Sequence, residues 1–223
     1  MNVLVVAAHP DDEVLGCGGT IARHTQAGDT VHILIVAEGA TSRVEGSTED
    51  VVQLIDAANG AAEVLGAEKP KMLSLPDNRL DTVALLDVIQ PIENVVREIS
   101  PEVVYTHHGN DLNLDHRIVH QATVTACRPL PESTVCRMYG FEAPSSTEWS
   151  TQSMGPAFNP THYVGIVDSL DAKVAALNCY DMEMRPFPHP RSIEAITALA
   201  KVRGSHCGLE AAEAFEVILD IRN

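Results

Sequence analysis

The first buried segment of the chain does most to limit the folds that it can adopt. Residues 3–8 (VLVVAA) form an unbroken apolar run, and Pro10 with a group of charged residues ends it. A strand without polar alternation is buried on both faces, which is typical of a parallel sheet covered by helices on each side. The opening residues therefore predict an α/β fold.

The rest of the chain alternates in the same manner. Helices are expected at 16–27, 50–65, 83–99, 116–126, 169–180 and 193–202, and strands at 31–36, 71–75, 103–106, 135–141, 163–167 and 215–221. This order predicts one domain over residues 1–223: a doubly wound, mostly parallel, Rossmann-like sheet with helices on both faces and active groups at the carboxyl ends of its strands. The least regular stretch, 143–162, is either a substrate-covering loop or a passive surface excursion.

The charge and the cysteine content limit which molecules the protein can bind and in which cellular compartment it is expected. The chain has 15 Lys and Arg against 31 Asp and Glu, a formal net charge of −16, so its field repels nucleic acids and anionic membranes. No basic segment precedes the short N-terminal apolar run, and no run approaches the roughly 18 apolar residues of a membrane-spanning helix. The 5 cysteines include no Cys-x-x-Cys pair. We therefore expect a cytoplasmic protein with reduced thiols, no nucleic-acid partner and no membrane insertion.

The residues directly after the first predicted strand combine an imidazole with three carboxylates: His9, Pro10, Asp11, Asp12 and Glu13. His9 and Asp12 can converge on one metal ion while Asp11 points elsewhere and stays unbound beside it. The alternative is that the acids cap the next helix, where negative charge is favoured. Capping accounts for one or two carboxylates, but not for a histidine and three acids at the end of a buried strand. We therefore favour a metal site.

One imidazole and one carboxylate do not complete a zinc site, so a further ligand must come from another strand end. The segment after a mid-chain predicted strand reads HHGNDLNLDH (residues 107–116) and is the second polar concentration in the chain. We choose His116 as the third ligand, with Asp115 able to accept a hydrogen bond and hold an imidazole in place. His107 and His108 stay open between lining the cleft and forming hydrogen bonds at the strand end.

These motifs resemble a known family. The segment AHPDDE after the N-terminal strand, GGT at the next helix and an Asp-His pair after a mid-chain strand are similar to those of the PIG-L/LmbE-type zinc-dependent N-deacetylases. The resemblance implies that His9, Asp12 and His116 bind Zn²⁺ and that Asp11 is the general base. It also implies a hydrolase that removes the acetyl group from a small N-acetylglucosamine-type sugar or sugar conjugate. The resemblance further implies that the chain can form homo-oligomers.

The chemistry of amide hydrolysis suits these residue types. A zinc ion lowers the pKa of bound water to about 7 and polarises the carbonyl group. Asp11, next to the ion but not bound to it, can take the remaining proton and return it to the departing nitrogen. We assign Glu13 to the helix side of the site, where it hydrogen-bonds a ligand or caps the helix.

Two positions depart from the family pattern. Many relatives carry a histidine three residues before the ligand histidine, where it is thought to polarise the substrate carbonyl, and this chain has Asn113 there. An asparagine can donate a hydrogen bond to an oxyanion but supplies no positive charge. The turn after the second strand is also altered, and Arg43 is its best candidate for a substrate contact.

Further candidate substrate contacts lie outside the two motifs. In the rigid, basic segment RPFPHPRS, Arg185 and Arg191 can grip a phosphate or carboxylate, or pair with nearby surface acids. His189 in the same segment is a candidate to stabilise the oxyanion in place of the missing histidine. Asp77 and Asn78 can hydrogen-bond sugar hydroxyls, although their types equally suit a plain turn.

Three other functions stay open. Gly16, Gly18 and Gly19 with Glu38 weakly resemble a dinucleotide-binding fingerprint, but the spacing is not GxGxxG and acidic residues stand where a pyrophosphate would lie. The second alternative is a non-catalytic metal- or nucleotide-binding Rossmann-like domain. Against it stands Asp11, because a site that only holds a metal does not need an unbound carboxylate beside the ion. An amidase on a non-sugar N-acyl substrate is the nearest enzymatic alternative, and nothing in the metal site excludes it.

Overall fold

The computed structural model describes residues 1–40 and 47–222, so the candidate Arg43 lies outside the described residues. One sheet runs in the order β3-β2-β1-β4-β5-β7-β6. Its strands are β1 Asn2–Ala7, β2 Thr30–Ala37, β3 Lys71–Leu75, β4 Val103–His107, β5 Arg137–Phe141, β6 His162–Gly165 and β7 Ala212–Asp220. The strands from β3 to β5 are parallel neighbours, whereas β7 runs antiparallel to both β5 and β6. The predicted mostly parallel sheet is confirmed.

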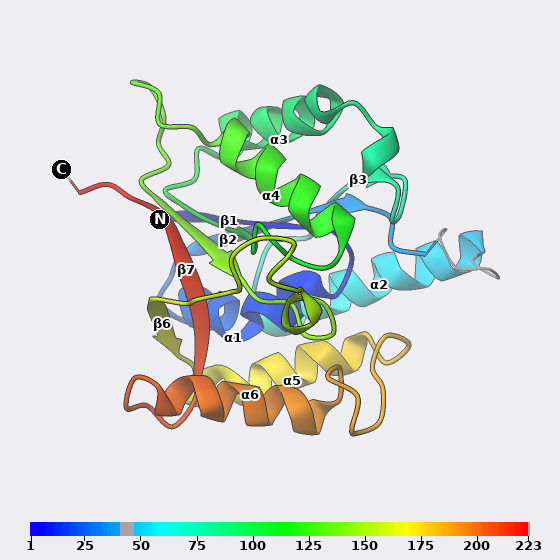
Figure 1. Cartoon of the computed structure of the whole chain (residues 1–223), viewed down its shortest axis with the longest axis vertical. Coiled ribbons are helices and arrows are strands. Elements are labelled where there is room, and N and C mark those ends of the chain that lie inside the picture. Colours follow the sequence, from blue (N-terminus) through cyan, green and yellow to red (C-terminus); the bar gives the residue numbers. More distant parts are fainter. Residues whose placement is uncertain (41–46, 223) are drawn as a thin grey trace.

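Helices cover both faces of this sheet. They are α1 Asp12–Gln26, α2 Thr48–Leu65, α3 Leu85–Ile99, α4 Leu114–Ala126, α5 Leu170–Cys179 and α6 Ile193–Ser205, with short 3₁₀ turns at Leu80–Thr82, Thr147–Trp149 and Val167–Ser169. Helices α3 and α4 lie on one face and α1 and α2 on the other, with α5 and α6 beyond them (Figure 1). The doubly wound α/β prediction is therefore confirmed. Within the described part of the chain, none of these helices combines the length and apolarity that crossing a membrane requires.

The first strand is apolar throughout because it contributes to two cores. Val3 and Val5 pack with buried side chains of α1 and α2. Leu4 and Val6 point to the other face and pack with those of α3 and α4. Since successive side chains of a strand alternate between faces, a central strand covered on both sides has no position for a polar residue.

Helix α1 begins earlier than its apolar spacing predicted. We expected a helix from residue 16, but α1 starts at Asp12, inside the charged group. Asp11 precedes it with a φ angle of 102°, which turns the chain sharply after β1. A second irregularity follows at Cys17, where φ is −147° and the helix is broken. The break separates a first turn, which carries the acids, from the longer second part whose spacing the sequence revealed.

The topology brings the two polar segments of the chain to one edge of the sheet. From β1 the sheet continues to β2 on one side and to β4 on the other, so a topological switch point lies between β1 and β4. Ligands of doubly wound folds bind at this point, outside the carboxyl ends of the strands. His9 follows β1, and the segment that leads to α4 follows β4. The fold therefore places both motifs where a site is expected.

Candidate metal centre and active site

The three predicted ligands converge at this edge. His9 lies just after β1, Asp12 begins α1, and His116 belongs to the first turn of α4. The Nδ1 atom of His9 and the Nε2 atom of His116 each lie 3.2 Å from Oδ2 of Asp12. One donor atom from each residue lies within 4.8 Å of the other two. The structure thus brings together side chains that are more than 100 residues apart in the sequence, as the His9–Asp115 contact at a separation of 106 residues illustrates.

A carboxylate supports each of the two imidazoles from behind. Oδ2 of Asp115 lies 3.1 Å from Nε2 of His9, and Oδ1 of Asp111 lies 3.1 Å from Nδ1 of His116. We expected Asp115 to hold an imidazole in place, and the imidazole that it contacts is that of His9, in the other motif. Such outer carboxylates fix the ring orientation of a metal-binding histidine and raise its basicity. Asp111 is placed to do this for the predicted ligand His116, and the sequence did not single it out.

Asp111 is held by several further hydrogen bonds. Its carboxylate accepts from the backbone N–H of Asn113 at 2.8 Å, from the hydroxyl of Ser146, and from Oγ1 of Thr147 at 2.5 Å. Burial raises the pKa of Asp111, but His116 and these hydroxyl donors outweigh it and bring the pKa down to about 2. The hydroxyls belong to the irregular loop 143–162, so part of that loop supports the site.

The electrostatics of the cluster favour the positively charged form of its two imidazoles. Burial lowers the pKa of His9, but hydrogen bonds with Asp115 and Asp12 outweigh burial and raise it to about 10. For His116, burial again lowers the pKa, and the carboxylates of Asp12 and Asp111 raise it to about 9. Burial raises the pKa of Asp12, but the neighbouring imidazoles hold it well below its usual range.

The residues fit a divalent cation. Among the described residues, Oδ1 of Asp12 is a buried side-chain oxygen that has no hydrogen-bond partner, although a buried carboxylate oxygen normally has one. Two imidazoles and one carboxylate are a ligand set that zinc accepts, and three protein ligands leave a coordination position for water or substrate. A second group of His9, Asp77 and Asp115 also lies close enough to hold an ion, but it shares His9 with the first.

The sequence left the roles of His107 and His108 open, and the structure gives each of them a polar partner. Nε2 of His107 accepts a hydrogen bond of 2.8 Å from the backbone N–H of Ala8, which ties β4 to the end of β1. Nδ1 of His108 lies 2.6 Å from Oε2 of Glu216 on β7. Both rings therefore bond at the strand end, and neither belongs to a group of side chains that could hold a metal ion in the described part of the chain.

Asp11 lies beside this cluster but not in it. Asp11 is only 2% exposed, and its side chain makes no capping hydrogen bond to α1. Burial raises the pKa of Asp11, the Arg191 guanidinium lowers it, and the result is about 7. The adjacent Glu13 accepts from the backbone N–H of Asp11 at 3.1 Å and from the hydroxyl of Tyr180 at 2.5 Å. Glu13 therefore braces the turn that presents Asp11.

Arg191 joins the basic segment to the site. Its Nη1 donates to Oδ2 of Asp11 at 2.6 Å and lies 3.6 Å from Oε2 of Glu183. Its Nε donates to the hydroxyl of Ser145 at 2.7 Å. Arg191 thus pairs with acids, as one of our two interpretations held, but one of those acids is Asp11. Arg185 is exposed, and its guanidinium donates to the backbone carbonyls of Met182 and Met184, just before the basic segment.

His189 and the irregular loop meet next to Arg191. Nδ1 of His189 accepts from the backbone N–H of Arg191 at 3.1 Å, so the neutral ring carries its proton on Nε2 and can donate from that atom. The ring packs edge-on against Trp149, with 6.3 Å between the ring centroids. Trp149 is 49% exposed, which leaves much of its surface open to a ligand.

Three residues predicted to contact the substrate, Asp77, Asn78 and Asn113, are linked to His9 and to one another by polar contacts. Oδ1 of Asp77 lies 3.4 Å from Nε2 of His9 and accepts from Nδ2 of Asn78 at 2.9 Å. Nδ2 of Asn113 donates to Oδ1 of Asn78 at 3.1 Å, while its Oδ1 accepts from the backbone N–H of Asp115 at 2.8 Å. Asn113 therefore caps α4 and uses one of the two N–H groups of its amide.

The class that the fold and the site define is an α/β protein with a histidine–carboxylate cluster at its topological switch point. The family model of PIG-L, GlcNAc-PI de-N-acetylase, matches residues 4–127, which is more than half of the chain. The chain belongs to the PIG-L family.

Individual relatives agree with this assignment. The chain is 30% identical over 150 residues to the uncharacterized deacetylase YaiS of Escherichia coli (strain K12), and the match covers 65% of this chain and 75% of the relative. It is 35% identical over 155 residues to the 1D-myo-inositol 2-acetamido-2-deoxy-alpha-D-glucopyranoside deacetylase of Rhodococcus jostii (strain RHA1), with 56% of this chain covered but only 52% of that relative. A crystal structure of a conserved protein from Thermus thermophilus superposes with a TM-score of 0.79 at 26% identity, covering 99% of this chain and 96% of that one.

One relative has a different reaction in its name. The chain is 26% identical over 208 residues to the 4-oxalmesaconate hydratase of Pseudomonas putida, and this match covers 80% of the chain and 72% of the relative. Family membership alone therefore does not fix the reaction.

Proposed function

We propose that the protein is a zinc-dependent hydrolase that removes the acetyl group from an N-acetylated amino sugar or sugar conjugate. One observation carries the proposal: His9, Asp12 and His116 converge, and Asp11 lies beside them with a pKa of about 7. A site that only retained a metal would not need a buried, unbound carboxylate there. The deacetylases among the relatives support the same reaction class.

The side chains around the cluster divide the work of amide hydrolysis. A divalent cation held by His9, Asp12 and His116 would polarise the carbonyl and make a water molecule acidic near neutral pH. Asp11 accepts the proton of the attacking water and returns it to the departing nitrogen. Arg191 holds the Asp11 carboxylate in place through its 2.6 Å contact.

We assign the substrate contacts to polar and aromatic side chains near Arg191 and near His9. Nε2 of His189 and the remaining N–H of Asn113 are the donors that we assign to the developing oxyanion. The exposed face of Trp149 suits stacking on a pyranose ring, because an aromatic ring offers apolar contact to a sugar face. Asp77 and Asn78 supply hydrogen-bonding groups for the sugar hydroxyls.

Acetate release tests the proposal directly. The purified protein is expected to release acetate from N-acetylglucosamine or one of its conjugates, to lose this activity after treatment with a chelator, and to regain it when Zn²⁺ is added. A panel with thiol, lipid, nucleotide and inositol conjugates identifies the attached group. No acetate from any member of the panel, with zinc bound, would contradict the proposal.

A hydratase is the second candidate, because the hydratase relative matches a larger share of this chain than the two deacetylases do. Water addition to an unsaturated carboxylic acid would use the same metal cluster and Asp11, with an arginine for the substrate carboxylate. Arg191 is the arginine beside Asp11, but Asp11 and Glu183 already contact it. Loss of the ultraviolet absorbance of an unsaturated di- or tricarboxylic acid, compared with acetate release, separates the two. An amidase on a non-sugar N-acyl substrate would release the acid from simple N-acyl amines.

Two further expectations belong to this proposal. We place the protein in the cytoplasm, and we propose that this chain can form homo-oligomers. Light scattering on a size-exclusion column checks the second expectation.

Asp111 provides a test of the metal cluster that leaves its ligands intact. Asp111→Asn is expected to weaken zinc binding by about 10- to 100-fold, because the outer carboxylate that orients His116 is lost. Competition with a chromophoric chelator measures the affinity. Glu216→Gln is the matched control, since Glu216 also pairs with a buried imidazole, His108, that is not a ligand. If Asp111→Asn and Glu216→Gln bind zinc with equal affinity, Asp111 does not orient His116 for the metal.

A further inference from the structure

Helix α1 is interrupted between the turn that carries the metal ligand Asp12 and the rest of the helix. The break lies at Cys17, whose φ and ψ angles are −147° and 25°. In an unbroken helix the backbone N–H of residue 19 would donate to the carbonyl of residue 15. Near the break, these backbone groups need other partners because they are buried and polar.

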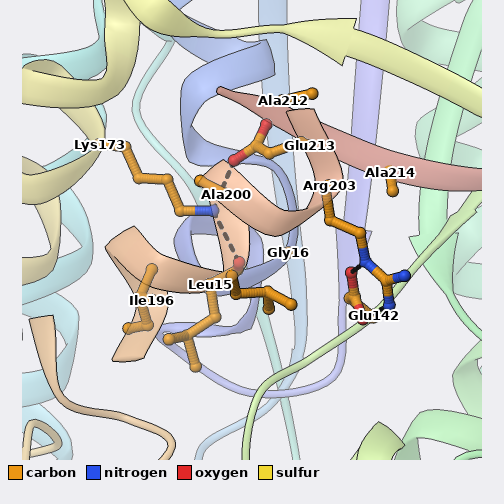
Figure 2. Close-up of a pocket in the computed structure, with 11 residues that line it drawn as sticks. Leu15, Gly16, Glu142, Lys173, Ile196, Ala200, Arg203, Ala212, Glu213 and Ala214 are labelled. Carbon is orange, nitrogen blue, oxygen red and sulfur yellow. Dashed lines mark hydrogen bonds and ion pairs between the residues drawn. The ribbon is translucent and has the colours of Figure 1, made fainter. Parts of the chain in front are cut away.

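An ion pair from two other elements provides those partners. The carboxylate of Glu213 on β7 accepts from the backbone N–H groups of Gly19 at 3.0 Å and Thr20 at 2.7 Å. The ammonium group of Lys173 on α5 donates to the carbonyl of Leu15 at 2.9 Å. The two side chains contact each other at 2.5 Å. Figure 2 shows Lys173 between Glu213 and Leu15.

The pair is inserted into the helix at the point where its own hydrogen bonding is interrupted. The backbone N–H of Gly19 donates to Glu213, and the carbonyl of Leu15 accepts from Lys173. The salt bridge between Lys173 and Glu213 links these two backbone groups. Both side chains are buried, with Lys173 3% and Glu213 5% exposed. A buried ion pair is weak evidence for stability as such, because desolvation of the two charges opposes their attraction. Its value here is geometric, since it fixes how the two parts of α1 meet.

Glycines give the pair and the first turn their room. A Cβ atom on Gly18 would lie 3.3 Å from the Lys173 side chain, and one on Gly16 would lie 2.2 Å from the ring of Phe141. The glycines that weakly resembled a dinucleotide fingerprint thus allow close packing around the break. They place the first turn of α1 against β5 and the second part against α5.

The geometry points to Lys173 and Glu213 as positioning residues for the metal-binding turn. The first turn of α1 carries Asp12 and Glu13 and follows Asp11 directly, so its direction sets where the ligand and the base lie. Two hydrogen bonds near the break fix that direction. Lys173 donates to the carbonyl of Leu15, and Glu213 accepts from the backbone N–H of Gly19. Both residues belong to the part of the chain beyond the family match at 4–127.

A double variant tests this role, which rests on the proposed metal site. Lys173→Met with Glu213→Gln removes both charges and keeps one side-chain acceptor for the backbone N–H groups. We expect zinc affinity to fall by about tenfold or more, as for loss of other groups that orient a ligand, with an altered visible spectrum of bound Co²⁺. The measurements are chelator competition, the Co²⁺ spectrum, and urea unfolding of the metal-free protein.

The matched control is the second ion pair that Figure 2 shows, between Arg203 and Glu142. Arg203 on α6 donates to Glu142 at 2.7 and 2.6 Å, and Figure 2 shows this contact separate from the contacts of Lys173 with Glu213 and Leu15. Arg203→Met with Glu142→Gln should lower unfolding stability while zinc affinity and the Co²⁺ spectrum stay at the wild-type values. This control separates positioning from a general loss of stability.

The outcomes are distinguishable. If the wild-type protein binds no zinc, the proposed function fails. If the wild type binds zinc and the Lys173/Glu213 double variant binds it equally well, with the same Co²⁺ spectrum, the positioning role is refuted. Should that double variant not fold without metal, Glu213→Gln alone is compared with the wild type. A weaker affinity then supports the role, and an unchanged one overturns it.

Discussion

Asp11→Asn is expected to lower kcat for deacetylation by about 10²- to 10⁴-fold, the usual contribution of a positioned general base. Asparagine has the shape of aspartate and can still accept from Arg191, but its amide cannot take a proton from water. Asp11 is not part of the metal-binding cluster, so zinc affinity should stay within the error of the wild-type value. Steady-state kinetics of acetate release together with chelator competition check both parts.

Arg191→Gln is the control for the contact that Asp11→Asn changes. Gln removes the guanidinium that lies 2.6 Å from Asp11 but leaves the carboxylate. If Asp11 is the base and Arg191 only holds it, Arg191→Gln should reduce kcat less than Asp11→Asn does. Wild-type turnover in Asp11→Asn would remove the base from the mechanism, whatever the second variant does.

The sequence predicted the elements and the convergence of the three candidate ligands because both leave local signals. A strand buried on both faces is apolar at every position, as residues 3–8 are, and the polar residues that follow it therefore stand out. The same contrast marks the segment 107–116 after β4. Because parallel strands end at a common edge, two such segments after neighbouring strands meet in space. This reasoning led to His9, Asp12 and His116 without knowledge of any contact.

The supporting residues left no such signal. The partners of Asp111 lie 35 and 36 residues further along the chain, and the contact between Arg191 and Asp11 spans 180 residues. Neither periodicity nor spacing encodes a contact of this kind. The sequence also did not say which imidazole Asp115 would contact, since its pairing with His9 depends on how the ends of β1 and β4 face each other. The start of α1 was misplaced because the break at Cys17 interrupts the apolar spacing of the helix.

His116→Ala is expected to abolish zinc binding and, with it, acetate release. The substitution removes one of three converging donor atoms, and the loss should exceed the about 100-fold that removal of an outer partner can cause. Metal content after dialysis, measured by atomic absorption, and acetate release at saturating zinc check the result. His120→Ala is the matched control, because His120 lies one turn further along α4 and hydrogen-bonds the carbonyl of His107.

Alanine at position 116 also removes one partner from each of two buried carboxylates, because Asp12 and Asp111 both contact His116. The metal-free variant is therefore expected to be less stable than the wild type, since a buried charge that loses a pairing group is costly. His116→Gln keeps a hydrogen-bond donor for Asp111 and separates this effect from loss of the ligand. If His116→Gln is folded and free of zinc, the loss of activity belongs to the metal site. If it binds zinc and turns over like the wild type, His116 is not a ligand and the hydrolase mechanism has to be abandoned.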